Sequence, residues 1–185
     1  MTTLDPLEKL RPSAKPRMMD LVQQAGIDVA PWAFRADGKP VKAPAANPAY
    51  CYEWCFVDND RVVVSLWFEL MSLADGRVVQ RVNMRDLRRR VERAKHLDAG
   101  TRTANVRRAV AVDSAVFRAF RESLPVRAIV CDGDRRDLDD VARRDPSKVE
   151  RRLLDDSPWH VTAYDIPSGD TVIARDQPLL TGVQS

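Results

Sequence analysis

The sequence predicts a single α+β domain in which an antiparallel or mixed β-sheet is backed by helices. Two patterns predict this class: a run of consecutive branched and aromatic segments between residues 50 and 83, and a final hairpin around the turn Pro167–Asp170. Helical patterns separate the two. A chain of 185 residues suits one domain with its own core. We expect that domain to span residues 15–176, with 1–14 as a flexible lead-in and 177–185 as a tail.

The first half of the chain begins with a helical pattern at residues 15–25, and Gly26 follows as a C-terminal cap. A loop rich in Pro, Ala and Gly covers residues 35–48. Three strands are then predicted, separated by turn clusters and forming a meander of three strands: Tyr50–Val57, Val62–Leu70 and Val78–Val82. The second is almost entirely apolar, which is typical of a central strand.

Helix and strand patterns alternate in the second half. Helices are expected over residues 84–95 and from about Val106 to Ser123, where Pro125 prevents continuation. A short apolar strand follows at 126–131, and a charged loop at 134–144. Asp145–Pro146 is typical of a helix start, and predicts a helix to about Leu154. Two closing strands are expected at residues 159–166 and 171–174.

Charge is distributed unevenly along the chain. The formal net charge is only +3, but residues 76–127 carry 14 Lys and Arg against 5 Asp and Glu. The segments on either side of this stretch are weakly acidic. Arginine outnumbers lysine 24 to 6, and its planar guanidinium suits phosphate. The basic middle of the chain therefore points to a polyanionic partner.

Several protein classes are excluded at this stage. No run approaches the roughly 18–20 apolar residues of a transmembrane helix, and the N-terminus lacks the apolar core of a secretory signal. The three cysteines are an odd number, which fits reduced thiols in a cytoplasmic protein with no membrane partner. No glycine-rich phosphate loop occurs, and we expect no cofactor.

Evidence for catalysis is thin. The chain has two histidines, His96 and His160, too few for the clustered ligands of a zinc or metal-dependent hydrolase site. No catalytic residues and no metal ligands are predicted, although an unrecognised enzyme using Cys131, His160 or Glu53 stays open. A strained G-x-S-x-G turn with a serine nucleophile is also absent from the sequence.

The strongest candidate site is the arginine-rich segment. An ordinary solvated helix mixes charges of both signs, whereas these positions are nearly all basic. Neutralisation by phosphates would relieve their repulsion and make binding salt-dependent. Solvated charges in an arginine-preferring protein, or an acidic protein partner, remain as alternatives. The expected nucleic-acid contacts are Arg85, Arg88, Arg89, Arg90, Arg93, Lys95, Arg102, Arg107 and Arg108.

Aromatic residues give a second candidate. On a strand, Tyr50, Tyr52, Trp54 and Phe56 would share one face, where they could stack on bases or form core beneath a helix. Glu53, on the opposite face, could accept from an exocyclic amine or pair with an arginine. The candidate base contacts are Tyr50, Tyr52, Glu53, Trp54 and Trp159.

Four stretches also share a family resemblance, and their order and spacing agree with it. They are residues 15–32, 47–54 (NPAYCYEW), 124–133 (LPVRAIVCDG) and 152–165 (RLLDDSPWHVTAYD). Together they resemble the N-terminal domain that precedes the HNH nuclease module in many bacterial modification-dependent restriction endonucleases. The resemblance covers most of residues 15–175 and implies target recognition. The HNH cysteines and histidines do not occur among these 185 residues, so it does not imply cleavage.

The sequence as a whole therefore predicts a DNA-binding recognition module. Its expected partner is double-stranded DNA, whose phosphates the arginine-rich helix would hold. The expected role is that of a reader of modified DNA in restriction or phage defence. The alternative is a regulatory subunit that binds a separately encoded nuclease through its basic surface.

Overall fold

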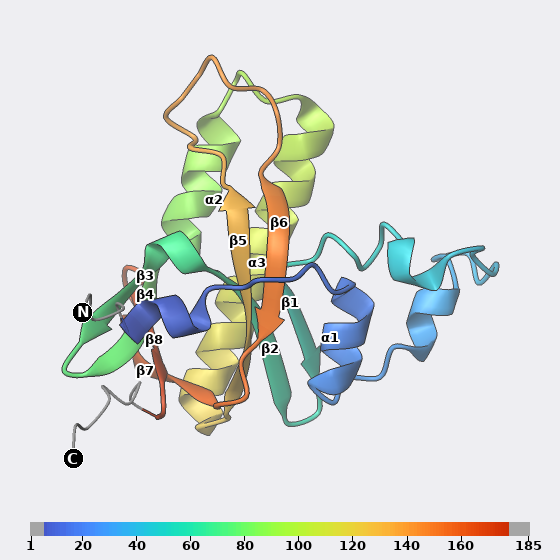
Figure 1. Ribbon diagram of the computed structural model, residues 1–185. Helices are drawn as coiled ribbons and strands as arrows, with labels where there is room; N and C mark the ends of the chain where they lie inside the picture. Colours follow the sequence, from blue (N-terminus) through green and yellow to red (C-terminus); the bar gives the residue numbers. More distant parts are fainter. Residues whose placement is uncertain (1–5, 178–185) are drawn as a thin grey trace.

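In the computed structural model, which describes residues 6–177, eight strands form one mixed sheet with helices on both faces (Figure 1). This arrangement confirms the predicted α+β class and the single domain. The strands are β1 (Cys55–Asp58), β2 (Arg61–Trp67), β3 (Met71–Ala74), β4 (Arg77–Val82), β5 (Val126–Asp134), β6 (Lys148–Leu154), β7 (Trp159–Tyr164) and β8 (Thr171–Arg175). The α-helices are α1 (Met18–Gln24), α2 (Met84–Arg93) and α3 (Ala99–Glu122).

The strands follow the order β1-β2-β5-β7-β8-β4-β3, and β6 pairs with β5 as a branch. Strands β2 and β5 are parallel, whereas the other pairs are antiparallel. β2 is an interior strand between β1 and β5, second from one edge of the sheet, and its valines are buried on both faces. Val62, Val64 and Leu66 pack with α3, while Val63 packs on the other face with α1 and Trp32. Because successive side chains of a strand point to opposite faces of the sheet, the core has two layers, one on each side of β2.

The sheet divides beside β5. Its residue Val126 pairs with Trp159 of β7, while Ile129–Asp134 pair with β6. β6 and β7 therefore follow the same edge of β5 in the same direction, interrupted at residues 155–158. β6 continues with β5 beyond the rest of the sheet, whereas β7 turns toward β8 (Figure 1).

A buried carboxylate holds this division in place. The Asp155 side chain accepts from the indole Nε1 of Trp159 at 2.7 Å and from Nε and Nη2 of Arg175 at 2.7 and 3.1 Å. Its backbone N–H donates to Ala128 in β5 at 3.0 Å. With Asp155 only 4% exposed, the charge is compensated by hydrogen bonds and by the guanidinium rather than by water. Asp155 therefore ties together the ends of β6, β7 and β8.

The expected meander of three strands is wrong. β1 and β2 form a hairpin at one edge of the sheet, whereas β3 and β4 form a second hairpin at the opposite edge. Phe68–Leu70, expected to end the second strand, form a 3₁₀ turn, and β3 follows directly at Met71. β5 pairs with β2 from far along the chain, and such long-range pairing leaves no mark in the local pattern.

The expected helix at residues 145–154 is also wrong, because Lys148–Leu154 form β6. Antiparallel pairing with β5 outweighs the local Asp-Pro start signal. A register shift at Gly133 marks this pairing. Gly133 has φ +148°, and a Cβ there would lie 2.3 Å from the carbonyl oxygen of Lys148. A side chain at position 133 would therefore force the two strands apart.

Residues 50–54 form turns rather than the first half of a strand, so β1 begins at Cys55. The buried side chain of Asn47 fixes this segment. Its Nδ2 donates to the carbonyls of Trp32 and Phe34 at 2.8 and 2.9 Å, while its Oδ1 accepts from Ala49 N. Amide side chains commonly stabilise turns in this way. The strand-face alternation predicted for Tyr50, Tyr52 and Trp54 therefore does not apply.

The ends of the domain differ in part from expectation. Residues 6–14, expected as a flexible lead-in, lie against the sheet: Leu10 is buried, and the Arg11 guanidinium lies 4.2 Å from the centre of the Phe68 ring. Residues 1–5 and most of the expected tail, 178–185, lie outside the described residues. α3 starts at Ala99, earlier than predicted, with the Asp98 side chain accepting from Thr101 N. Within residues 6–177, no helix has the length and apolar character needed to cross a membrane.

We predict that Asp155→Ala lowers the free energy of unfolding by about 3–5 kcal/mol, because it leaves Arg175 and the Trp159 indole without their buried partner. Urea denaturation measures the effect. Asp156→Ala, which removes an exposed carboxylate next in the chain, is the control and should change the stability by less than about 0.5 kcal/mol. A loss below about 1 kcal/mol for Asp155→Ala would contradict the role of this residue.

Candidate nucleic-acid interface

Helix α2 presents a set of exposed basic side chains. The Asn83 side chain caps its N-terminus by accepting from Asp86 N at 2.8 Å, and Val91 is buried beneath the helix. The rest of the helix surface is available to the long basic side chains. We call these exposed residues the α2 basic face: Arg88, Arg89, Arg90, Arg93 and Lys95.

Three ion pairs partly compensate the α2 basic face. Arg88 lies 3.6 Å from Glu92, Arg89 lies 3.4 Å from Asp86, and Arg90 lies 2.9 Å from Asp139 in the loop after β5. Over residues 6–177, no carboxylate lies within 4 Å of Arg93 or Lys95. Exposed pairs of this kind contribute about 0–1 kcal/mol and weaken with salt, so a stronger anion can replace them.

Two of the predicted contacts, Arg85 and Arg102, act instead within the fold. The Arg85 guanidinium donates to Asp113 at 3.1 Å, to the Tyr164 hydroxyl at 2.9 Å and to the Ile166 carbonyl at 2.7 Å. Its hydrogen bond with Asp113 raises the pKa of Arg85. Arg102 donates to the Leu97 carbonyl at 2.7 Å and so stabilises the turn between α2 and α3. These arginines join elements of the scaffold and do not belong to the α2 basic face.

The remaining two arginines, Arg107 and Arg108 of α3, form a separate cluster around Glu53. Arg107 makes two hydrogen bonds to the carboxylate, at 2.8 and 2.6 Å, and Arg108 donates to it at 3.4 Å. These bonds raise the pKa of the Arg107 guanidinium. Because the Glu53 side chain is only 12% exposed, we assign it to anchoring residues 50–54 on α3. This is the arginine ion pair that the sequence left open, and it occupies the oxygens that a base amine would need.

The predicted aromatic contacts lie in four different environments. The ring of Tyr50 stacks on the buried Trp32, with 5.2 Å between ring centres. Trp54 is half-buried against the core beneath α3. Trp159 is fully buried and donates to Asp155, so it cannot reach a ligand at the surface. Tyr52 is 63% exposed, and of this set it is the residue that offers its ring to solvent.

A basic hollow lies beside Tyr52. We call it the Tyr52 hollow; it measures about 260 Å³ and is lined by Lys15, Pro16, Arg17, Met18, Ala45, Cys51, Tyr52 and Arg152. Sequence reasoning missed its three basic residues because they lie outside residues 76–127 and come together only in the fold. The local pattern also predicts Arg152 on a helix, whereas it lies on β6. The signal that singles them out is their place within the stretches that carry the family resemblance.

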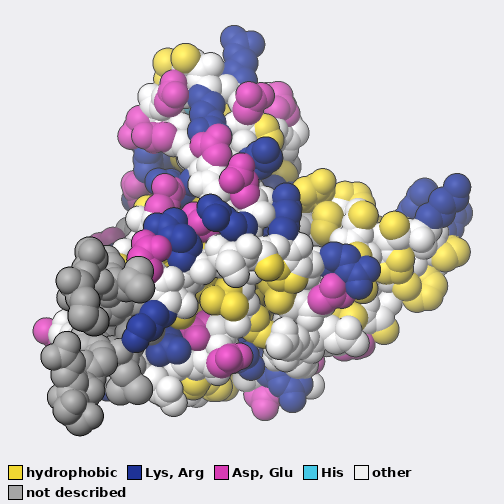
Figure 2. Space-filling model, in the orientation of Figure 1, with side chains coloured by type: hydrophobic (Ala, Val, Ile, Leu, Met, Phe, Trp, Pro, Cys, Tyr) yellow, Lys and Arg dark blue, Asp and Glu magenta, His cyan; other side chains and the backbone are white. Residues whose placement is uncertain are grey.

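The surface around β6 is mixed in charge rather than uniformly basic. Figure 2 shows Lys and Arg side chains interspersed with Asp and Glu across the face that carries β6, with apolar side chains gathered toward the arm formed by residues 28–50. Arg11 and Arg151 both approach Asp132 on this side, at 3.3 and 3.0 Å. Positive charge on this face is therefore balanced by nearby carboxylates.

The groups considered for catalysis are not brought together. His160 Nδ1 lies 2.6 Å from Asp176, and the Cys131 thiol is buried with the Ile129 carbonyl at 3.9 Å. Burial raises the pKa of Cys55 to about 12 and that of Cys131 to about 11, and it also raises the pKa of Cys51. All three thiols are thus protonated near neutral pH, a poor state for a nucleophile. Within residues 6–177, no group of His, Cys, Asp or Glu is arranged to hold a metal ion.

Comparison of the chain with protein-family models, with curated proteins and with solved structures finds no match. The resemblance to the N-terminal domain of modification-dependent HNH restriction endonucleases therefore stays a prediction from the sequence. The case for a function rests mainly on the physical properties of the α2 basic face and the Tyr52 hollow.

We predict that Glu53→Gln lowers the free energy of unfolding by about 1.5–3 kcal/mol, the usual range for hydrogen bonds to a charged group. The loss arises because Arg108 and the turn at residues 50–54 lose their shared anion. Glu92→Gln serves as the matched control, because it removes only an exposed pair with Arg88 and should cost less than about 0.5 kcal/mol. Equal losses in the two variants, measured by urea denaturation, would contradict the anchoring role.

We also predict that the three thiols react slowly with a disulfide reagent at pH 8. A raised pKa leaves less thiolate at this pH than a free cysteine has, and burial limits access to Cys55 and Cys131. Cys51, which is half-buried, should be the fastest of the three. The absorbance of the released thiol, compared with and without urea, measures the rates. If the thiols react as fast in the folded protein as they do in urea, the fold does not protect them and the prediction is wrong.

Proposed function

We propose that this chain is a DNA-binding recognition module that contacts the phosphate backbone of double-stranded DNA through the α2 basic face. The observation that carries the proposal is the concentration of five exposed cations on and just after one helix, two of which have no carboxylate within 4 Å over residues 6–177. Keeping like charges together is unfavourable for an isolated fold, and a polyanion relieves that cost.

The dimensions of α2 suit a duplex. Ten residues at about 1.5 Å each give a helix about 15 Å long, and an α-helix fits the major groove, which is about 12 Å wide. Arginine forks hold phosphate oxygens with two donors at once. Arg88 and Arg89 pair with carboxylates of α2 itself, and Arg90 pairs with Asp139 of the loop after β5. Because these pairs are exposed, each arginine can exchange its carboxylate for a phosphate.

The target class comes from the sequence resemblance. Residues 15–175 resemble a domain that precedes a DNA-cleaving module in modification-dependent restriction systems. This favours DNA over other polyanions, and modified DNA in restriction or phage defence over a general role. Among residues 6–177, no group of His, Cys, Asp or Glu is arranged to hold a metal ion, and burial raises the pKa of all three thiols. The proposal is confined to binding.

Fluorescence anisotropy with a labelled duplex, measured between about 50 and 200 mM salt, tests the proposal. We expect the logarithm of the association constant to fall linearly with the logarithm of salt concentration. Arg93→Ala/Lys95→Ala should weaken binding for all duplex sequences and reduce the magnitude of the salt slope by about 2, because two phosphate contacts are lost. A duplex carrying methylated cytosine should bind more tightly than its unmodified form if the module reads modification.

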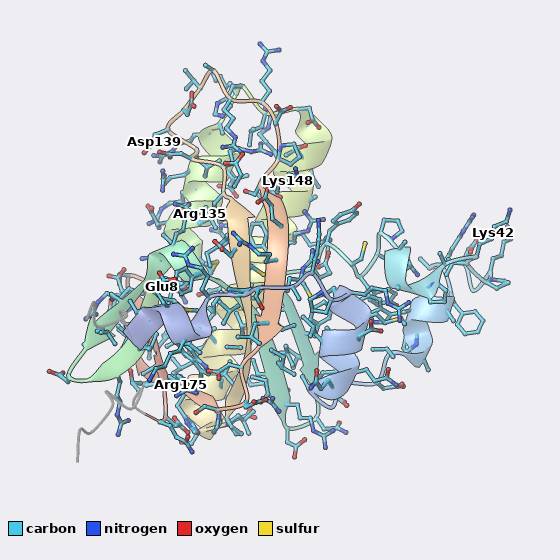
Figure 3. The ribbon with its side chains drawn as sticks, in the orientation of Figure 1. Glu8, Lys42, Arg135, Asp139, Lys148 and Arg175 are labelled. Atoms are coloured by element: carbon cyan, nitrogen blue, oxygen red, sulfur yellow. The ribbon has the colours of Figure 1, made fainter. Side chains whose placement is uncertain are left out.

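Lys39→Ala/Lys42→Ala is the matched control, because it removes the same charge from the arm. Figure 3 labels Lys42 at the end of the arm, across the molecule from Asp139, which pairs with Arg90. This variant should bind as the original chain does. Absence of duplex binding at the lowest salt, or equal losses in the two double variants, would overturn the proposal. Binding to an acidic protein but to no duplex would favour a protein partner instead.

A further inference from the structure

The Tyr52 hollow is built from three separate parts of the chain. Residues 15–18 lead into α1, residues 45–52 form the turn before β1, and Arg152 comes from β6. The backbone N–H of Arg152 donates to the Ala14 carbonyl at 2.8 Å, which fixes the first part against the third. Figure 1 shows this N-terminal segment crossing in front of β6 on its way to α1. The hollow is therefore a product of the fold and not of one flexible loop.

The charge of the Tyr52 hollow is positive. Its lining has three cations and no carboxylate, and Asp20 pairs with only one of them, Arg17, at 2.7 Å. Over residues 6–177, no carboxylate lies within 4 Å of Lys15 or Arg152. Arg152 donates through Nη1 to the Pro16 carbonyl at 3.4 Å, and its buried Nε has no hydrogen-bond partner. The positive charges of Lys15 and Arg152, which no carboxylate of the lining neutralises, favour an anionic ligand.

The hollow also has an exposed aromatic wall. Tyr52 is 63% exposed, although the turn that carries it is held firmly by Asn47 on one side and by the Glu53 cluster on the other. The neighbouring Cys51 thiol is protonated near neutral pH and adds no negative charge. An exposed ring on an anchored turn, beside the cations Lys15 and Arg152, is suited to a ligand that combines a phosphate with a planar ring, since bases stack on aromatic side chains.

From these observations we propose that the Tyr52 hollow binds a nucleoside monophosphate unit, with the phosphate on Lys15 and Arg152 and the base stacked on Tyr52. A hollow of about 260 Å³ encloses part of such a ligand and leaves the rest in solvent. The larger hollow of the arm, about 480 Å³, is lined mainly by small apolar residues and has Arg35 as its one charged residue and no aromatic side chain, so it lacks this combination.

The proposal goes beyond DNA binding by the α2 basic face. The unit has the same chemistry whether it is a free mononucleotide or an unpaired nucleotide within a strand. The α2 basic face shares no residue with the Tyr52 hollow, so each site can fail its own test.

Calorimetric titration of the full chain with deoxyadenosine monophosphate, deoxyadenosine and inorganic phosphate tests the proposal. We expect deoxyadenosine monophosphate to bind more tightly than deoxyadenosine or inorganic phosphate does. Tyr52→Leu should weaken monophosphate binding by about tenfold, as expected for loss of one stacked base, and leave phosphate binding unchanged. Tyr52→Phe, which keeps the ring, should bind as the original chain does.

Lys15→Ala should weaken both the monophosphate and inorganic phosphate by about three- to tenfold, since it removes an exposed charged donor. Lys42→Ala removes a cation from the arm and is the matched control. Monophosphate binding no tighter than phosphate, or unaffected by Tyr52→Leu, would overturn the proposal.

A competition experiment then identifies the source of the unit. If a duplex with one unpaired adenosine displaces the monophosphate, the proposal is supported and the strand is a source. If the monophosphate binds and is not displaced, the proposal is supported with the free nucleotide as ligand. Monophosphate binding that survives Arg93→Ala/Lys95→Ala separates the two sites. Monophosphate binding by a chain that binds no duplex would overturn only the proposed DNA-binding function.

Discussion

The Asp155 carboxylate receives four hydrogen bonds at the point where the sheet divides, from the Ser157 backbone N–H, the Trp159 indole and, twice, the Arg175 guanidinium. On one side of this point, β6 continues with β5 and leads back from the loop whose Asp139 meets Arg90 of α2. On the other side, β7 pairs with β8, and β8 pairs with β4, which leads directly into α2. Both connections to the α2 basic face, and the placement of Arg152 on β6, therefore depend on how the chain turns at Asp155.

The arginines of this fold divide into those that join elements of the scaffold and those that lie exposed at the surface. Arg85, Arg102 and Arg175 donate to carboxylates and carbonyls between elements, which is a use that the planar, multiply donating guanidinium suits better than lysine. Arg93 and Lys95 have no carboxylate partner over residues 6–177. The excess of arginine in residues 76–127 is therefore not all available to a ligand, and the surface charge is smaller and more localised than the sequence count implies.

The sequence predicts what local patterns control. The mostly apolar β2, the arginine-rich helix and the closing hairpin all follow from periodicity and turn residues. The errors arise where distant contacts prevail: Asn47 draws Tyr50 and Tyr52 out of a strand, and pairing with β5 makes residues 148–154 a strand despite Asp145–Pro146. Distant contacts also explain why the sequence predicts only part of the candidate site. Glu53 and Trp159 carry buried bonds that no linear pattern reveals, whereas the Tyr52 hollow requires residues 15 and 152 to meet.

The most direct test of DNA binding by the α2 basic face is a map of the DNA contact on the intact chain. Two-dimensional amide NMR spectra of the isotope-labelled protein, recorded during titration with a duplex at low salt, provide it. We expect the largest shifts at residues 88–95, and we expect them to disappear as salt is raised. Binding with shifts confined to other elements, or no shifts at any residue, would contradict the assignment of the α2 basic face as the DNA-binding surface.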